Sequence, residues 1–251
     1  MDLLSLSSND LLIALFLFFG AILYTSVGHA GSSVYIAIMA LFGLAANVIK
    51  PTALVLNIFV SSFTSWRYLR AKLFDLKLFI PLAIGAIPMS FIGGGIELSN
   101  EIYKPIVGLL LVFAGINYLF LGKRQFRKEI TPPKFLVALF VGASIGLLAG
   151  LTGTGGGIFL SPIALLFNWS AVKQISGTTS LFILTNSVFG LLGHASSVSQ
   201  LPSTLPVFVV AVLLGAAIGT VLGITKFSNE KVKRALGLVL IIAGLKLTLG
   251  L

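Results

Sequence analysis

Apolar runs, separated by short polar or glycine-rich breaks, follow one another along the whole chain. Read against those breaks, they predict ten helical segments, at residues 11–27, 31–45, 51–68, 77–96, 103–121, 134–151, 156–168, 174–193, 204–224 and 232–250. Most of them approach the roughly 20 residues with which a helix crosses the hydrocarbon core of a bilayer. The segments at 31–45 and 156–168 are shorter, and each follows a glycine-rich break. The pattern leaves open whether these two segments span the bilayer or re-enter it.

The composition of the chain indicates a membrane environment. Of the 251 residues, 57% are hydrophobic and 10% are charged, and the mean hydropathy is +1.08. A soluble domain carries about 25% charged residues. We therefore predict an all-α integral membrane protein that is surrounded by the lipid bilayer. The sequence contains no cysteine, which excludes disulfide bonds, thiolate metal ligands and a cysteine nucleophile.

The charges of the links predict how the chain is threaded through the cell (plasma) membrane. The links at 67–77, 122–134 and 225–234 are basic, and the positive-inside rule places such links in the cytoplasm. The link at 97–104 is more acidic than basic and the link at 194–203 holds no Lys or Arg, so both are expected outside, as are the two termini. The net charge of +10 does not indicate nucleic acid, because basic and aromatic residues do not interleave on one polar face.

The predicted topology divides the chain into two related halves. Five segments per half is an odd number, so the second half should be inverted relative to the first. The sequence GLLLVFAG at Gly108–Gly115 resembles GLVLIIAG at Gly237–Gly244. We predict a first transmembrane repeat at 1–122, a cytoplasmic basic linker at 123–133 and a second, inverted transmembrane repeat at 134–251. Inverted repeats with a broken segment in each half are typical of secondary transporters.

A glycine cluster between the sixth and seventh segments is the strongest candidate for a binding site. The sequence from Gly153 to Gly157 holds four glycines, each of which costs about 1 kcal/mol relative to alanine in a helix. We expect the helix to break there, so that Thr154, Gly155, Gly156 and Gly157 present backbone N–H groups to an anion. The alternative is that these glycines only allow close helix packing.

The first half has a counterpart to this break and further polar residues inside apolar runs. The counterpart, Gly28–Ser33, has fewer glycines but contributes His29, Ser32 and Ser33 as candidate donors. The other candidates lie in the third and eighth segments: Asn57, Thr178, Thr179, Ser180 and Asn186. Such uncharged side chains either bind substrate or hydrogen-bond to their own and neighbouring helices. The sequence leaves both readings open.

The candidate residues favour an anionic substrate over a cation or a reaction. The predicted spans contain no Asp or Glu, so they lack the carboxylates of a proton relay or a cation cage. Lys50 and Lys173 precede the third and eighth segments, where they would attract anions or snorkel to the interface. His29 would couple transport to protons or serve as a structural histidine.

A catalytic site is not indicated by the sequence. Two separated histidines without an acidic partner in the spans make no triad, and no metal-ligand spacing occurs. The cluster at 153–157 also lacks the Lys-Ser/Thr ending of a phosphate-binding loop. We therefore expect no enzyme, no metal and no cofactor.

Two motifs carry a family resemblance that covers nearly the whole chain. The sequences GTGGGIFLSP at Gly153–Pro162 and GTTS at Gly177–Ser180 are similar to the glycine-rich and GTS signatures of the sulfite exporter TauE/SafE family, also called the sulfonate-uptake permease family. The resemblance implies transport of small organosulfur anions, such as sulfite or sulfonates, driven by an ion gradient. Gly28–Ser33 departs from the family's glycine-rich pattern and has no following proline.

These observations lead to one leading hypothesis and two alternatives. The leading hypothesis is a secondary carrier that moves small oxyanions by alternating access, with the polar candidates around a central site. An anion channel and a noncatalytic membrane scaffold subunit are the alternatives. The exact substrate, the direction of transport, the coupling ion and the oligomeric state, including a homodimer, stay open at this point.

Overall fold

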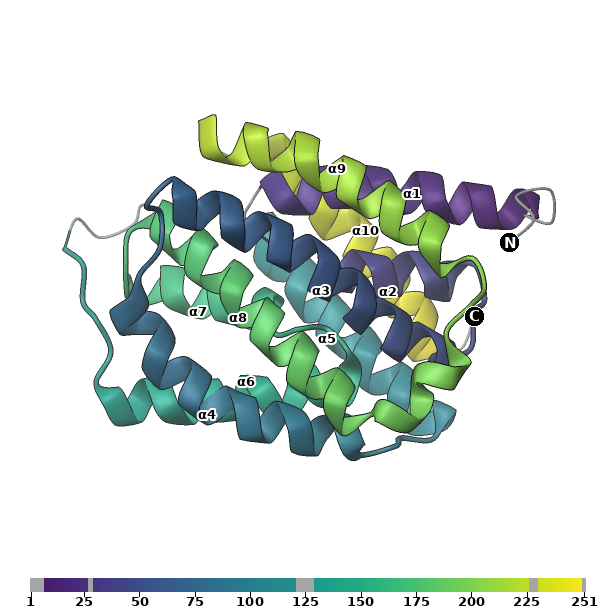
Figure 1. Ribbon diagram of the computed structural model, residues 1–251, viewed down its shortest axis with the longest axis horizontal. Helices are drawn as coiled ribbons and strands as arrows, with labels where there is room; N and C mark the ends of the chain where they lie inside the picture. Colours follow the sequence, from purple (N-terminus) through teal and green to yellow (C-terminus); the bar gives the residue numbers. More distant parts are fainter. Residues whose placement is uncertain (1–6, 27–28, 121–128, 226–229, 250–251) are drawn as a thin grey trace.

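The computed structural model describes residues 7–26, 29–120, 129–225 and 230–249. These residues form ten α-helices and one 3₁₀-helix, with no β-strand among them (Figure 1). The helices are α1 Ser8–Ser26, α2 Ser32–Leu41, α3 Ala46–Arg70, α4 Leu76–Gly95, α5 Asn100–Phe120, α6 Phe135–Thr152, α7 Gly157–Leu166, α8 Val172–Gly193, η3 Ala195–Gln200, α9 Leu205–Thr225 and α10 Glu230–Leu249. Each predicted segment overlaps one α-helix, so the all-α prediction is confirmed. Gly28 and the basic residues at 123–128 lie outside the described residues.

The second and seventh helices are the two short ones. Helices α2 and α7 have 10 residues each. At 1.5 Å per residue they are about 15 Å long, half of the roughly 30 Å hydrocarbon core of a bilayer. Neither helix alone is long enough to cross it. Both are shorter than the predicted segments at 31–45 and 156–168.

The start of α3 differs from the sequence expectation. The apolar pattern placed the third segment at 51–68. The structure starts α3 at Ala46, so Pro51 lies inside the helix. Lys50, which was expected in the preceding link, is therefore a residue of α3, and its side chain is only 5% exposed.

The helices are arranged in pairs around a central pair. Helices α3 and α8 pack against each other in the middle of the bundle, α4 packs on α6, α1 packs on α9 and α5 packs on α10. Figure 1 shows the α4–α6 pair along the lower edge and the α1–α9 pair along the upper edge, with α3 and α8 between them. In the predicted halves, α4 corresponds to α9 and α1 corresponds to α6. The α4–α6 contact of one half with the other is therefore repeated as the α1–α9 contact.

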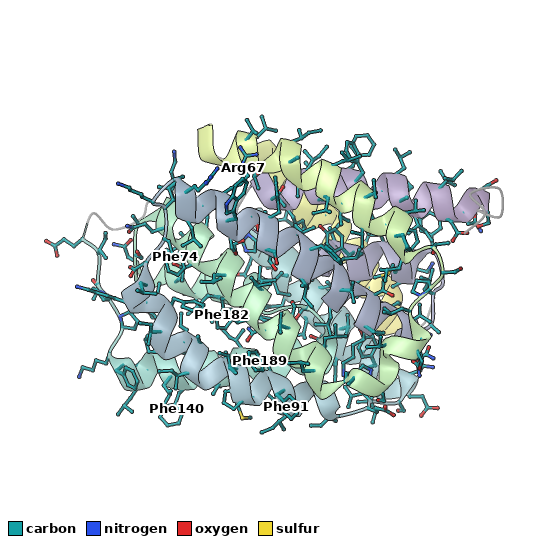
Figure 2. The ribbon with its side chains drawn as sticks, in the orientation of Figure 1. Arg67, Phe74, Phe91, Phe140, Phe182 and Phe189 are labelled. Carbon is teal, nitrogen blue, oxygen red and sulfur yellow. The ribbon has the colours of Figure 1, made fainter. Side chains whose placement is uncertain are left out.

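Polarity in this bundle is reversed relative to a soluble protein. Phe91 and Phe140 project outward from the α4–α6 edge and are 50% and 68% exposed (Figure 2). Asn57 of α3 and Asn186 of α8 are instead completely buried. Within the described part of the chain, six helices are long and apolar enough to span a membrane: α1, α3, α4, α6, α8 and α9. The chain is a multi-pass membrane protein whose apolar perimeter faces lipid.

Glycines bring α5 and α10 into backbone contact. A methyl group on Gly108 would lie 2.6 Å from the carbonyl oxygen of Gly244, and a methyl group on Gly244 would lie 2.6 Å from that of Gly108. Gly115 and Gly237 approach each other in the same way, at 2.6 and 2.7 Å. Because the predicted halves align Gly108 with Gly237 and Gly115 with Gly244, exchanging the halves maps one contact onto the other.

Candidate functional site

The two helix breaks, which are far apart in the sequence, contact each other. Nε2 of His29 lies 3.1 Å from the carbonyl oxygen of Gly157. Because a carbonyl oxygen can only accept, Nε2 carries the hydrogen in this bond. The hydroxyl of Ser32 donates to the carbonyl oxygen of Thr154. Two of the three candidates of the first break, His29 and Ser32, are therefore bonded to the backbone of the second.

The backbone between α6 and α7 needs glycine at three positions, the first of which is Gly153 with a φ of +79°. Gly155 and Gly156 have φ angles of +67° and +83°, which side-chain-bearing residues rarely adopt. A methyl group on Gly155 would lie 3.0 Å from Nδ2 of Asn57 and 3.1 Å from Oγ of Ser187. A methyl group on Gly156 would lie 3.1 Å from Nδ2 of Asn186. Polar side chains from α3 and α8 thus approach the broken backbone directly.

These three side chains, Asn57, Asn186 and Ser187, form what we term the central cluster. All three are completely buried. Neither side-chain atom of Asn57 has a hydrogen-bond partner, nor does Oδ1 of Asn186 or Oγ of Ser187. Nδ2 of Asn186 is the exception, because it donates to the carbonyl oxygen of Gly155 at 3.4 Å.

Unpaired buried atoms of this kind are unusual in a folded protein. An unsatisfied buried polar group costs about 1–3 kcal/mol, and native structures hold few of them. Several in one place, beside a broken helix, call for a partner from outside the chain, such as a ligand or ordered water. Thr52, also on α3, adds a further buried and unpaired hydroxyl.

The start of α7 adds backbone donors to the same place. Gly156 is the N-cap of α7 and makes no side-chain capping bond. The N–H groups of Phe159 and Leu160 bond to the carbonyl oxygen of Gly156, each at 3.1 Å. The N–H groups before them have no partner within the helix, and they lie at the positive end of its dipole. Together with the central cluster they are suited to the oxygens of a small anion.

Ser33 and Thr179 are among the predicted site residues that are already bonded to neighbouring hydroxyl groups. Oγ of Ser33 lies 2.7 Å from the hydroxyl of Tyr24. Oγ1 of Thr179 lies 3.0 Å from Oγ of Ser161, which places it against α7. Both pairs are buried, so these residues hold α1 to α2 and α7 to α8.

The other residues of the GTTS motif lie farther from the central cluster. Oγ1 of Thr178 accepts from the backbone N–H of Asp75 at 3.0 Å, and Asp75 in turn caps α4. The hydroxyl of Ser180 is bonded to those of Thr64 and Ser65 on α3. Thr178 precedes Asn186 by two turns of α8, about 12 Å along the axis.

Sequence reasoning missed two residues near the break, Ser187 and Tyr103, and it did not predict the contacts of Lys50. Ser187 directly follows Asn186, and this adjacency in the eighth segment was the available signal. Tyr103 donates its hydroxyl to the carbonyl oxygen of Thr152 at 2.9 Å. Nζ of Lys50 donates to the carbonyl oxygens of Gly94 and Ile96, at 3.0 and 3.2 Å. Contacts between helices this far apart in sequence leave no mark in a single sequence.

One titratable group at the end of α8 has a shifted pKa. Burial lowers the pKa of His194 below its ordinary 6.5, and the nearby positive charge of Lys50 lowers it further. Glu97 acts in the opposite direction. His194 is therefore held in its neutral form at pH 7.

Comparison with known proteins identifies the family. A sequence model of the family described as "Sulfite exporter TauE/SafE" matches residues 12–247. The chain belongs to the TauE/SafE family. The match extends over both helix breaks and both halves of this TauE/SafE protein, and it confirms the resemblance that the two glycine and threonine motifs indicated. No solved structure matches the chain.

Several relatives of this TauE/SafE protein are named as transporters. It is 38% identical over 238 residues to "Probable membrane transporter protein y4hK" of Sinorhizobium fredii, covering 94% of this chain and 96% of the relative. It is 28% identical to "Probable membrane transporter protein YjnA" of Bacillus subtilis, covering 94% of this chain and 98% of the relative. A weaker match, 24% identical over 56% of this chain, is "Probable membrane transporter protein MJ0441" of Methanocaldococcus jannaschii.

Proposed function

We propose that this chain is a secondary transporter of small sulfur oxyanions, of the sulfite and sulfonate type, and that it binds them at the central cluster. The unpaired side chains of Asn57 and Ser187 beside Gly155 are the observation that carries this proposal. Membership of a transporter family supports it from an independent direction. The proposed activity is transport, with no catalytic step.

The chemistry of the central cluster suits an oxyanion. Sulfite and sulfonate oxygens are acceptors, and the amide of Asn57, the hydroxyl of Ser187 and the first N–H groups of α7 are donors. Hydrogen bonds to a charged acceptor are about twice as strong as neutral ones. The unpaired Oδ1 atoms of Asn57 and Asn186 are acceptors, which suits the hydroxyl of a protonated substrate or a coupling cation.

Alternating access by two inverted halves is part of the same proposal. The exchange of contacts between α4–α6 and α1–α9, and between the paired glycines of α5 and α10, supports the division into two related repeats. In such transporters one half rocks against the other around a fixed site, driven by an ion gradient. We place the termini outside the plasma membrane and the 123–133 linker in the cytoplasm, following the link charges.

The test is an exchange assay in proteoliposomes that contain the purified protein. Labelled sulfite or methanesulfonate should enter with saturating kinetics, and unlabelled substrate on the far side should accelerate its entry. Ser187→Ala should reduce uptake, whereas Ser196→Ala, an exposed residue of η3, should leave it unchanged. Flux without saturation or counter-exchange would instead identify an anion channel. No flux of any sulfur oxyanion would favour the scaffold alternative.

A further inference from the structure

Two neighbouring cavities open at one end of the bundle, beside the starts of α3 and α5. The larger has a volume of about 330 Å³ and includes Lys50, Glu97 and Ser99 in its lining. The smaller has a volume of about 170 Å³ and includes Lys104 and Lys246. Small-molecule sites have volumes of about 300–1,000 Å³, so the larger cavity is sufficient for a small anion.

The two cavities share a wall that leads toward the helix break. Ala46 and Tyr103 line both of them. The hydroxyl of Tyr103 donates to the carbonyl oxygen of Thr152, the last residue of α6 before the glycine cluster. A methyl group on the next residue, Gly153, would lie 3.3 Å from Cγ of Lys50. The inner wall of the cavities thus contacts the backbone of Thr152 and Gly153, where the break between α6 and α7 begins.

The charge of these cavities is positive. Among the described residues that line them, Lys50, Lys104 and Lys246 are basic and Glu97 is the one carboxylate. Lys50 bonds to the end of α4, and Nζ of Lys246 donates to the carbonyl oxygen of Leu41 at 2.9 Å. Both ammonium groups therefore donate to neutral carbonyl oxygens and have no carboxylate as their hydrogen-bond acceptor. Such a cleft with low-dielectric walls concentrates anions.

We propose that the two cavities form an anion-collecting vestibule, in which Lys50, Lys104 and Lys246 bind a small oxyanion before it reaches the central cluster. This inference rests on the proposed transport function for its role, but the charge selectivity of the vestibule is independent of transport. The vestibule lies at the end of the bundle that holds the links at 97–104 and 194–203.

The chain contains no cysteine, so a single introduced thiol reports on the vestibule. Ser99→Cys places a thiol in the larger cavity, and Ser203→Cys places one on the exposed turn before α9 as a control. Each purified variant reacts with an anionic and a cationic methanethiosulfonate reagent at pH 7. For each thiol, the rate with the anionic reagent is divided by the rate with the cationic reagent. This ratio does not depend on how reactive the thiol itself is.

The expected ratio at position 99 is about fivefold higher than at position 203 in low salt, and it falls in high salt. Lys104→Gln and Lys246→Gln should each lower the ratio at position 99 by about twofold, and Lys104→Arg should preserve it. Equal ratios at the two positions, or ratios that the Gln variants do not change, would overturn the vestibule. Failure of transport with the ratios intact would instead overturn the proposed function alone.

Discussion

Nε2 of His29 donates to the carbonyl oxygen of Gly157, a residue 128 positions later in the chain. This bond joins the break that precedes α2 to the first residue of α7. The partner of His29 is a backbone carbonyl, which accepts the same N–H whether the imidazole is neutral or protonated. The geometry therefore favours a structural histidine over a proton-coupling one.

Replacement of His29 tests this reading. His29→Ala leaves the carbonyl of Gly157 without its partner and should lower the free energy of unfolding by about 1–3 kcal/mol. His29→Gln retains an N–H donor and should recover part of that loss, as measured by thermal unfolding in detergent. The pH profile of transport should be the same in His29→Gln as in the unmodified protein. A pH profile of transport that is flatter in His29→Gln than in the unmodified protein would instead support a role of His29 in proton coupling.

Gly155→Ala tests whether the space at the break matters beyond the backbone conformation. Gly43, which lines the smaller cavity of the vestibule, offers a control for the backbone strain, because its φ is +79° and a methyl group there would have no neighbour within 4 Å. Both alanines carry the left-handed strain of about 1–2 kcal/mol. Only Gly155→Ala also displaces Asn57 and Ser187, so it should reduce transport by about tenfold or more, equivalent to 1.4 kcal/mol. Equal effects of the two substitutions on uptake would argue against a site at Gly155.

The hydroxyl of Thr178 is predicted to stabilise the turn between α3 and α4. Thr178→Val removes the acceptor of the Asp75 N–H and should lower the free energy of unfolding by about 1 kcal/mol. Thr178→Ser keeps the hydroxyl and should restore the stability. The KM for transport should be unchanged in both variants. A raised KM with unchanged stability would instead move Thr178 into the binding site.

The pKa of His194 predicts a pH dependence of stability. Burial and Lys50 lower this pKa in the folded protein, so below pH 6.5 the unfolded chain binds more protons than the folded one. Protonation therefore opposes folding, and the unfolding temperature should fall as the pH decreases from 7.5 to 5.5. The fall should be smaller in His194→Gln. An equal fall in both proteins would assign the effect to other groups.

The sequence predicted the helices because their formation depends on local information. Apolar runs and the cluster at Gly153–Gly157 determine where helices form and where one must break, without reference to distant residues. The third segment was predicted from residue 51, whereas α3 starts at Ala46, and the burial of Ala46 in the folded protein cannot be read from the apolar pattern. Asn57 and Asn186 stood out as amides in apolar runs, and the structure places both at the break.

The pairing between helices could not be read from one sequence. Ser187 approaches the break only because α8 packs on α3, and a single serine in a membrane helix usually bonds to its own backbone. Thr178 and Ser180 belong to a motif that singled them out, yet their hydroxyls are bonded elsewhere. Lys50 and Tyr103 contact residues 44 to 49 positions away. The sequence therefore predicts the polar candidates, and only the packing shows which of them meet.

The unpaired amide of Asn57 allows a direct test of the proposal that the central cluster binds the substrate. Asn57→Leu replaces the amide by an apolar group of similar shape, which removes the burial penalty of an unsatisfied polar group. A group kept for ligand binding should therefore be dispensable for stability. If the amide had a structural role, its removal would destabilise the protein.

The most direct measurement is a thermal-shift titration of purified protein and of Asn57→Leu with sulfite or methanesulfonate, against chloride at equal ionic strength. A ligand that binds only the folded state adds about 2.7 kcal/mol at a hundred times its Kd. We predict that the ligand raises the unfolding temperature of the unmodified protein, and that Asn57→Leu is at least as stable without ligand but shows no shift. A destabilised Asn57→Leu, or one that retains the full shift, would contradict a binding site at the central cluster.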